Sequence, residues 1–400
     1  MADEPSFSQQ AITAIKERVP EITGHSLIID GFAHDNLDNA ITAALLTAEP
    51  AFAHAVKAQL DELYPEEYAI AEKHFAAGGA FSFPLDLKPG ELPPVTILSP
   101  FQPLDDVYDP PTLLAGKLSW HGALGGHLTD DEVYEEASRF MRFAGWHEVG
   151  HTVAVIRGHA DDFDPLPHPD DLEEWPEVIE EIAWRNADEQ YADGYGLRQI
   201  ASEDPDMGLV TALEVSDYRA INIVAGLIKG MQNIPIYSTD SAITAAIRDM
   251  TGYVEPGGLI KDPGSDTIAE QTHQAVLSGK IDPEDLAELK VCGDTLKDAL
   301  HQSDEAFAQQ LGQLGKGATG SPLYYLARNY ISAMDRLLPD EHPMREPFAQ
   351  AGKAVAQNPE ADFWDHQNPP VFNAMIAANQ KLKRLAKQPR PQPPQARRRP

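Results

Sequence analysis

The sequence predicts a mainly α-helical fold with a small β-sheet, in the α+β class. Along most of the chain, apolar residues recur at intervals of three and four, the spacing of a buried helix face. Two short segments, 94–98 and 117–120, instead resemble strands between turn-rich stretches. With 400 residues and 42% hydrophobic content, the chain can bury the cores of two or three domains.

The N-terminal part is expected to form helices over 8–19 and 40–63, followed by the two strands. A central helix is expected from just before Val133 to Ala154, because Thr129 and Glu132 form a capping-box signature. A second central helix is predicted over 175–200, where apolar residues again step by three or four.

Beyond residue 201 the pattern indicates almost only helix. Amphipathic or apolar stretches broken by Pro and Gly lie at 211–229, 240–250, 283–314, 321–338 and 371–385. We therefore divide the chain into an N-terminal helical region (1–90), a catalytic core (91–202), a C-terminal helical domain (203–380) and a disordered tail (381–400) rich in basic residues, Pro and Gln. The sequence contains no internal repeat.

Residues 147–151 read H-E-x-x-H and lie on the first central helix. His147 and His151 fall one turn apart on the face that carries the apolar residues, with Glu148 beside them. A single histidine that points into the core usually makes one hydrogen bond and has no further role. Two such histidines with an adjacent glutamate favour a shared metal ion, with zinc the ion that this ligand spacing suits best.

Two carboxylates interrupt the inward face of the second central helix, at Glu189 and Asp193. Burying an unpaired carboxylate is costly, so both need a cation. A zinc ion facing Glu189, with Asp193 accepting the second N–H of a histidine ligand, would satisfy both. An ordinary ion pair with Arg185 or Arg198 is the alternative.

His147-Glu148-x-x-His151 followed by Glu189-x-x-Ala192-Asp193 resembles the gluzincin branch of the zincin metallopeptidases, over about residues 115–200. The resemblance implies a zincin-like metal core with one Zn²⁺ bound by His147, His151 and Glu189, Glu148 as general base, and Asp193 as support. Glu180, Glu181 and Asp188 are alternative third ligands. The metzincin continuation is absent, because Ala154 and Arg157 stand where it requires Gly and His.

The expected activity is hydrolysis of peptide bonds in a peptide or protein substrate, because three protein ligands leave one zinc position open for an activated water. Tyr218, Tyr237, His273 and His301 are candidate donors to the oxyanion, and Tyr195 is less suitable because it lies off the ligand face. Either predicted strand could pair with the substrate. A catalytically inactive zincin-like scaffold and a helical interaction protein remain alternatives.

The net charge of −32 argues against nucleic-acid binding by the body of the protein. The tail from 381 to 400 has eight Lys or Arg and no acid, so it could bind an acidic partner. Ten acids between 161 and 181 predict an acidic loop that would favour basic peptides if it overhung the site.

Absence of a long apolar run or signal peptide predicts no membrane association and a cytoplasmic location, with non-classical export also open. Cys292, the single cysteine, excludes an intramolecular disulfide.

Overall fold

The fold is taken from a computed structural model that describes most of the helical part of the chain. The described ranges are 7–31, 33–61, 65–76, 80–85, 95–99, 130–156, 176–230, 234–237, 283–316 and 342–356, with single positions between 239 and 250 and between 327 and 338. The predictions for 117–120, 371–385, the tail, His273 and all of the acidic segment before residue 176 lie outside these ranges. None of the helices described is long and apolar enough to cross a membrane.

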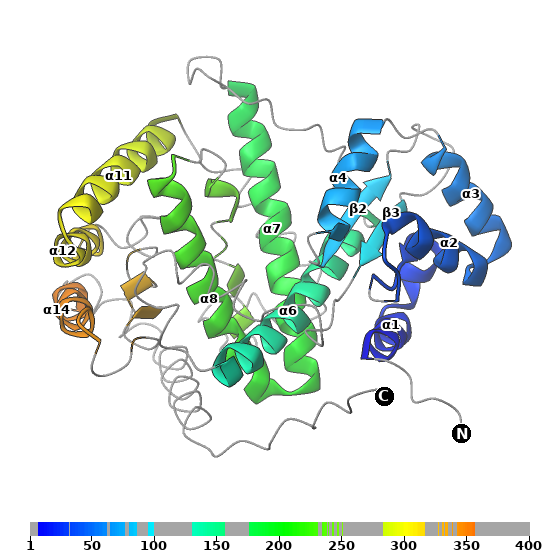
Figure 1. Ribbon diagram of the computed structural model, residues 1–400, viewed down its shortest axis with the longest axis horizontal. Coiled ribbons are helices and arrows are strands. Elements are labelled where there is room, and N and C mark those ends of the chain that lie inside the picture. Colours follow the sequence, from blue (N-terminus) through cyan, green and yellow to red (C-terminus); the bar gives the residue numbers. More distant parts are fainter. Residues whose placement is uncertain are drawn as a thin grey trace, which may run out of the picture.

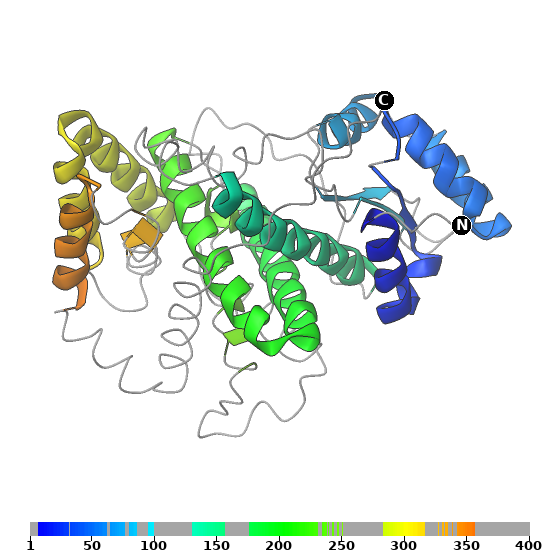
Figure 2. The same cartoon turned by 60° about the horizontal axis from the view of Figure 1, so that its bottom comes forward.

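The elements form three groups in a row (Figures 1 and 2). At one side, the sheet lies with α1 (Phe7–Arg18), η1 (Pro20–Gly24), α2 (Leu37–Thr47), α3 (Pro50–Leu60) and α4 (Pro65–Ala76). The middle group holds α6 (Asp130–Ile156), α7 (Pro176–Glu203), α8 (Pro205–Ile228) and η5 (Ile234–Tyr237). The far side holds α11 (Pro283–Gln302), α12 (Asp304–Leu314) and α14 (Arg345–Ala356). The prediction of a mainly helical protein with a small sheet is confirmed for the described residues.

The sheet has three strands in the order β1 (Ser26–Ile28), β3 (Val95–Ser99) and β2 (Phe81–Leu85). β1 runs parallel to β3, and β2 runs antiparallel to it. The strand predicted at 94–98 is confirmed as β3, but it occupies the middle of the sheet and pairs on both sides. It therefore cannot accept a substrate strand, and the edge strand that contacts the motif helix α6 is β2.

Two helices expected as continuous stretches are each divided in two. The stretch at 40–63 breaks between α2 and α3, because Pro50 starts a new helix and Glu49 caps it by accepting a hydrogen bond from the Phe52 N–H. The stretch at 283–314 breaks at Ser303, whose hydroxyl accepts from the Ala306 N–H. In both cases a local capping residue overrides a continuing apolar pattern.

The two central helices are confirmed as α6 and α7, and the stretch predicted at 211–229 is the latter part of α8. Thr129, the proposed cap of α6, lies just before the described part of that helix. The boundary drawn at residue 90 falls within the sheet, since β1 and β2 precede it and β3 follows it. The N-terminal region thus contains strands as well as helices.

Three clusters of buried side chains support the three groups. The sheet core packs Leu27, Ile29 and Ile97 against α2, α3 and α4. The middle core joins α1, α6, α7 and the first half of α8 through Trp146, Tyr191, Val215 and others. The C-terminal core joins the second half of α8 to α11, α12 and α14. α8 therefore belongs to two cores at once.

Cys292 lies buried in the C-terminal core on α11. Burial raises the pKa of its thiol to about 11, so the thiolate is scarce at neutral pH. Since the thiolate is the reactive form of cysteine, this residue acts as an apolar packing group.

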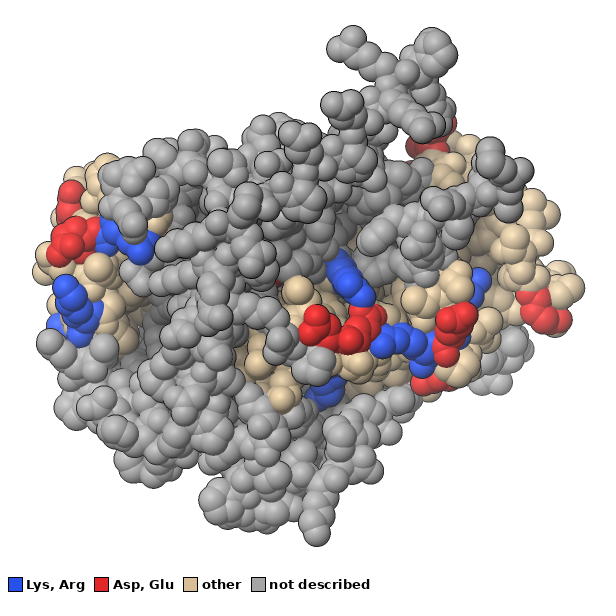
Figure 3. Space-filling view, turned by 90° about the horizontal axis from the view of Figure 1, so that it is seen from below, with Lys and Arg blue, Asp and Glu red and all other residues tan. Residues whose placement is uncertain are grey.

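Basic and acidic side chains lie next to each other in small groups on the described surface of one face (Figure 3). Arg18 and Arg142 both meet the carboxylate of Glu203, so α1, α6 and the end of α7 share one ion-pair group. Arg18 also lies over the Trp146 ring, 5.6 Å from its centroid. These contacts fasten the N-terminal helix to the helix that carries the H-E-x-x-H motif.

Candidate metal centre

Close approach of α6 and α7 brings the two halves of the predicted site together. Gly150 on α6 faces Ala192 on α7, and a Cβ on Gly150 would lie 2.8 Å from the Ala192 Cα. Gly196 faces α6 in the same way, where a Cβ would lie 3.1 Å from the backbone nitrogen of His147. Because small residues stand at both contacts, the helix backbones approach closely enough for short side chains to meet between them.

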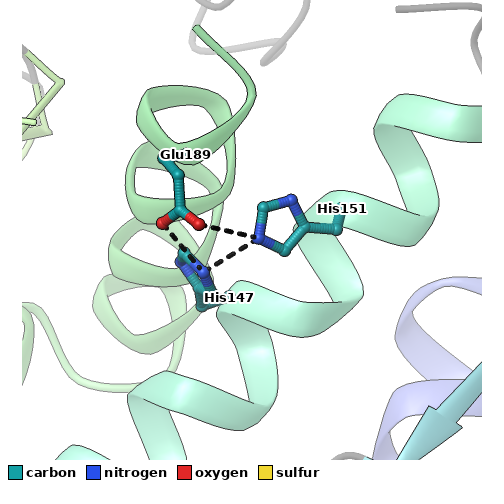
Figure 4. A group of neighbouring side chains, drawn as sticks. All are labelled: His147, His151 and Glu189. Carbon is teal, nitrogen blue, oxygen red and sulfur yellow. Dashed lines mark hydrogen bonds and ion pairs between the residues drawn. The ribbon is translucent and has the colours of Figure 1, made fainter. Parts of the chain in front are cut away.

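His147 and His151 from α6 and Glu189 from α7 point toward one another in the space between these helices (Figure 4). The two Nε2 atoms lie 3.0 Å apart. Glu189 Oε2 lies 3.6 Å from Nε2 of His147, and Oε1 lies 3.9 Å from Nε2 of His151. The three residues each offer a ligand atom within 4.8 Å of the others. The predicted ligand set is therefore brought together.

Both imidazoles are held from behind by carboxylates of α7. Nδ1 of His147 lies 2.8 Å from Asp193 Oδ1, and Nδ1 of His151 is hydrogen-bonded to Asp188 Oδ2 at 2.7 Å. In a neutral imidazole, the nitrogen that faces a carboxylate carries the proton, so the lone pair lies on the other nitrogen. Both Nε2 lone pairs then face the space between the helices.

The donor set fits a divalent zinc ion. Two imidazole nitrogens and one carboxylate oxygen are common ligands of catalytic zinc, and ligands at about 2.0–2.1 Å from a tetrahedral ion stand roughly 3.3 Å from one another. The two Nε2 atoms lie 3.0 Å apart, and the Glu189 carboxylate approaches them at 3.6 Å through Oε2 and at 3.9 Å through Oε1, so the three groups lie close to that spacing. Asp188, Glu189 and Asp193 bring three negative charges, and Arg219 compensates one. The remaining negative charge, to which the neighbouring Glu148 adds, would attract a divalent cation.

Arg219 of α8 is the arginine that meets both buried carboxylates of α7. Its Nε and Nη2 donate to the Asp193 carboxylate at 3.0 and 2.7 Å, and Nη2 also donates to Glu189 Oε2 at 2.8 Å. The partner expected from the sequence was Arg185 or Arg198, and the arginine that pairs with Glu189 and Asp193 is instead Arg219. It could have been found, because Arg219 is the one basic residue in the 24 residues of α8.

Asp193 is completely buried and receives a third donor, the Thr239 hydroxyl, at 2.5 Å from Oδ2. Burial acts to raise the pKa of Asp193, but Arg219 and His147 hold it well below its usual range. The carboxylate thus stays ionised. The expected supporting role of Asp193 at His147 agrees with this geometry, as a link between His147 and Arg219.

Glu148 lies beside the ligand group and is fixed by the edge strand β2. Its carboxylate accepts a hydrogen bond from the backbone N–H of Ser82. The Ser82 hydroxyl lies 3.1 Å from that of Thr152, which ties β2 to the next turn of α6. Burial raises the pKa of Glu148, although His147 and His151 act to lower it. The residue is therefore placed to exchange a proton near the site.

The alternative ligands have other positions. Asp188 contacts Nδ1 of His151, the ring nitrogen that faces away from His147 and Glu189. Glu181 precedes Glu189 by eight residues on α7, which is about 12 Å along the helix axis, and Glu180 is farther still. The side chains of Glu180 and Glu181 are not among those described.

Of the proposed oxyanion donors, His273 lies outside the described residues, and Tyr237 interacts with the charges of both Glu189 and Glu148. The Arg219 guanidinium lies over the Tyr237 ring, 5.3 Å from its centroid. Burial and the charge of Glu189 raise the pKa of Tyr237 to about 12, with Glu148 also contributing. Tyr218 packs between the middle and C-terminal cores, and His301 is exposed at the end of α11. Tyr195 stacks with Tyr191 in the middle core.

Comparison of the chain with protein-family models, with curated proteins and with solved structures finds no match. The function is therefore argued from the geometry of the site.

Proposed function

We propose that the protein is a zinc-dependent metallopeptidase. The observation that carries the proposal is the convergence of His147, His151 and Glu189, with each imidazole held at Nδ1 by its own carboxylate and with Glu148 alongside. A core histidine needs one hydrogen-bond partner, whereas this arrangement directs two Nε2 atoms and a carboxylate at one point. Such convergence is typical of a metal site.

Glu148 is the proposed general base and acid. A zinc ion at the site supplies Lewis-acid activation of a water and of the substrate carbonyl. Glu148 takes the proton from the attacking water and returns it to the leaving amine, so no covalent intermediate with the protein is needed. The Ser82 N–H orients the carboxylate, and the raised pKa brings it closer to the pH at which it must work.

Tyr237 is the proposed donor to the oxyanion. Because its pKa is about 12, its hydroxyl stays protonated at neutral pH and can donate a hydrogen bond to the developing negative charge. Its contact with Arg219 ties the ring to the same network that holds Glu189. Of the candidates, this residue best combines a protonated donor with a position at the site.

The substrate is proposed to be a peptide or protein segment in extended conformation. Among the described strands, β2 lies at an edge of the sheet, and Ser82 on it already contacts the proposed general base. An extended chain that pairs with β2 on the side away from β3 would pass beside Glu148. Of the two segments first expected in this role, 94–98 is the central strand β3, and 117–120 lies outside the described residues; β2 was not predicted from the sequence.

Zinc content and peptide cleavage, measured on wild type and on Glu148→Gln, test this proposal. We expect stoichiometric zinc in both proteins and at least about a 10²-fold lower cleavage rate in the variant, because the proton acceptor is lost. Glu305→Gln, on the solvent side of α12, is the matched control and should cleave normally. A wild type that holds zinc without cleaving any member of a diverse peptide library would indicate the inactive scaffold instead. Absence of zinc would indicate the helical interaction protein.

The third ligand is tested separately by Glu189→Ala. Removal of one of three protein ligands should weaken zinc binding strongly, as measured by competition with a chromophoric chelator. If this variant binds zinc as tightly as wild type, the ligand assignment is wrong although the metal site stands.

A further inference from the structure

One guanidinium, that of Arg219, joins a proposed zinc ligand to the residue that supports another ligand. Its side chain is buried and makes a two-nitrogen contact with Asp193, which in turn lies against Nδ1 of His147. The same Nη2 that bonds Asp193 also bonds Glu189 Oε2 at 2.8 Å. Arg219 thus touches no imidazole, yet it fixes Glu189 relative to His147.

The two oxygens of Glu189 are in different situations. Oε2 accepts a charge-assisted hydrogen bond from Arg219 and lies 3.6 Å from Nε2 of His147, whereas Oε1 approaches Nε2 of His151 at 3.9 Å. Hydrogen bonds that involve two charged groups are stronger than neutral ones, so part of the electron density of Oε2 is already engaged. Oε1 is left as the better ligand atom.

We propose that Arg219 is a positioning residue that restricts Glu189 to one-oxygen binding and so keeps a fourth position open at the metal. The inference rests on the metal site proposed above. A carboxylate can bind a metal through one oxygen or both, and two-oxygen binding would fill the position that a catalytic zinc site must leave for water or substrate. The hydrogen bond from the Arg219 guanidinium to Oε2 keeps this oxygen away from the metal and so prevents two-oxygen binding by Glu189.

Arginine suits this task better than lysine. Its planar guanidinium carries several N–H donors in fixed directions, so one group can hold Asp193 with two nitrogens and Glu189 with one of them. A lysine ammonium would keep the positive charge, but it lacks the guanidinium's N–H donors in fixed directions. Packing on the Tyr237 ring keeps the guanidinium plane in place from the other side.

Cobalt(II) is the probe, because its visible absorption is stronger in four-coordinate than in five- or six-coordinate sites. We compare wild type, Arg219→Met and Arg219→Lys after replacement of any zinc by cobalt, and we measure zinc affinity by chelator competition. Both variants should show weaker, shifted cobalt bands as Glu189 binds with both oxygens. Zinc affinity should fall by about 10–100-fold, the usual effect of removing a residue that orients a ligand.

Arg142→Met is the matched control, since Arg142 also lies near the motif, on α6, but pairs with Glu203 at the surface. It should keep the wild-type spectrum. A purely structural role for Arg219 would lower the midpoint of thermal unfolding and leave the cobalt spectrum unchanged. If Arg219→Met does not fold, Arg219→Lys, which keeps the charge, decides the test.

Two failures are distinguishable. If wild type binds neither zinc nor cobalt, the metal site itself is wrong. If wild type binds cobalt and the folded Arg219 variants have its spectrum and its zinc affinity, only the role of Arg219 is overturned.

Discussion

Each imidazole of the proposed site depends on one carboxylate behind it, and for His151 that carboxylate is Asp188. The hydrogen bond of 2.7 Å between them fixes the tautomer and the orientation of the ring. Asp188→Ala should therefore weaken zinc affinity by about 10–100-fold, measured by chelator competition. Asp188→Asn, which retains an acceptor, should lose less, and Asp61→Asn, at the exposed C-cap of α3, should lose nothing. Equal affinity in Asp188→Ala and wild type would contradict the arrangement.

Zinc binding is also expected to release a proton from His151. Burial acts to lower the pKa of His151, but Asp188, Glu189 and Glu148 together raise it to about 10. Metal-free protein therefore carries a proton on His151 at pH 7, and zinc must displace it, so zinc affinity should rise with pH up to about 10.

Calorimetric titration of zinc at pH 7, in buffers that differ in ionisation enthalpy, should show release of about one proton. Asp188→Ala should release less, because its His151 loses a charge that raises the pKa. Zinc binding whose enthalpy is the same in every buffer would count against this protonation state.

At the level of single residues, the sequence indicated the ligands better than their supports. His147, His151, Glu189 and Asp193 could be found because the polar residues interrupt apolar helix faces at regular spacing. Asp188 was considered only as a ligand, because one-dimensional spacing does not distinguish the two sides of an imidazole. Arg219 was overlooked because it lies on another helix, and no periodicity links residues 26 positions apart.

At the level of elements, the contact between α6 and α7 controls the site. Gly150→Ala would place a Cβ 2.8 Å from the Ala192 Cα, a backbone atom that cannot rotate away. The helices must then separate, which should cost about 1–3 kcal/mol of unfolding free energy, as for other overpacked contacts. Zinc affinity should fall too, because both histidines move away from Glu189.

Urea unfolding and chelator competition measure the two effects of Gly150→Ala. Gly24→Ala is the control, because a Cβ at Gly24 has nothing within 4 Å, and its stability should stay within about 0.5 kcal/mol of wild type. If Gly150→Ala matched that control in both measurements, the helices would not be in contact as described.

The elements that could be predicted are those with long periodic patterns. α6 and α7, of 27 and 28 residues, each carry many repeats of the apolar spacing. β1 has three residues, all buried, so it has no alternation to recognise. β2 contains Pro84, which a sequence pattern counts against a strand but an edge strand tolerates. Of the two strands missed, β2 is the one that contacts the motif helix.

At the level of the whole molecule, the C-terminal core should determine stability without forming the site. Phe307 is fully buried there and makes an edge contact with Tyr330, with ring centroids 5.9 Å apart. Phe307→Ala should lower the free energy of unfolding by about 3–5 kcal/mol. Zinc affinity of the folded variant should be unchanged, because the ligands come from α6 and α7 and not from this core.

Val291→Ala on α11 is the control for Phe307→Ala, since Val291 is 66% exposed. It should change stability by no more than about 0.5 kcal/mol. Urea unfolding measures stability and chelator competition measures zinc affinity. A loss of zinc affinity in folded Phe307→Ala would mean that α8 transmits changes in its C-terminal half to Arg219.

The buried thiol of Cys292 can report how often the C-terminal core opens. With a pKa of about 11 and 5% of the residue exposed, the thiol should be alkylated mainly when α11 moves away from the core, so the rate of labelling counts those openings. As the chain has one cysteine, every labelled molecule reports the same event. Labelling with and without zinc would reveal whether an ion held between α6 and α7 slows the opening of a core at the other end of α8.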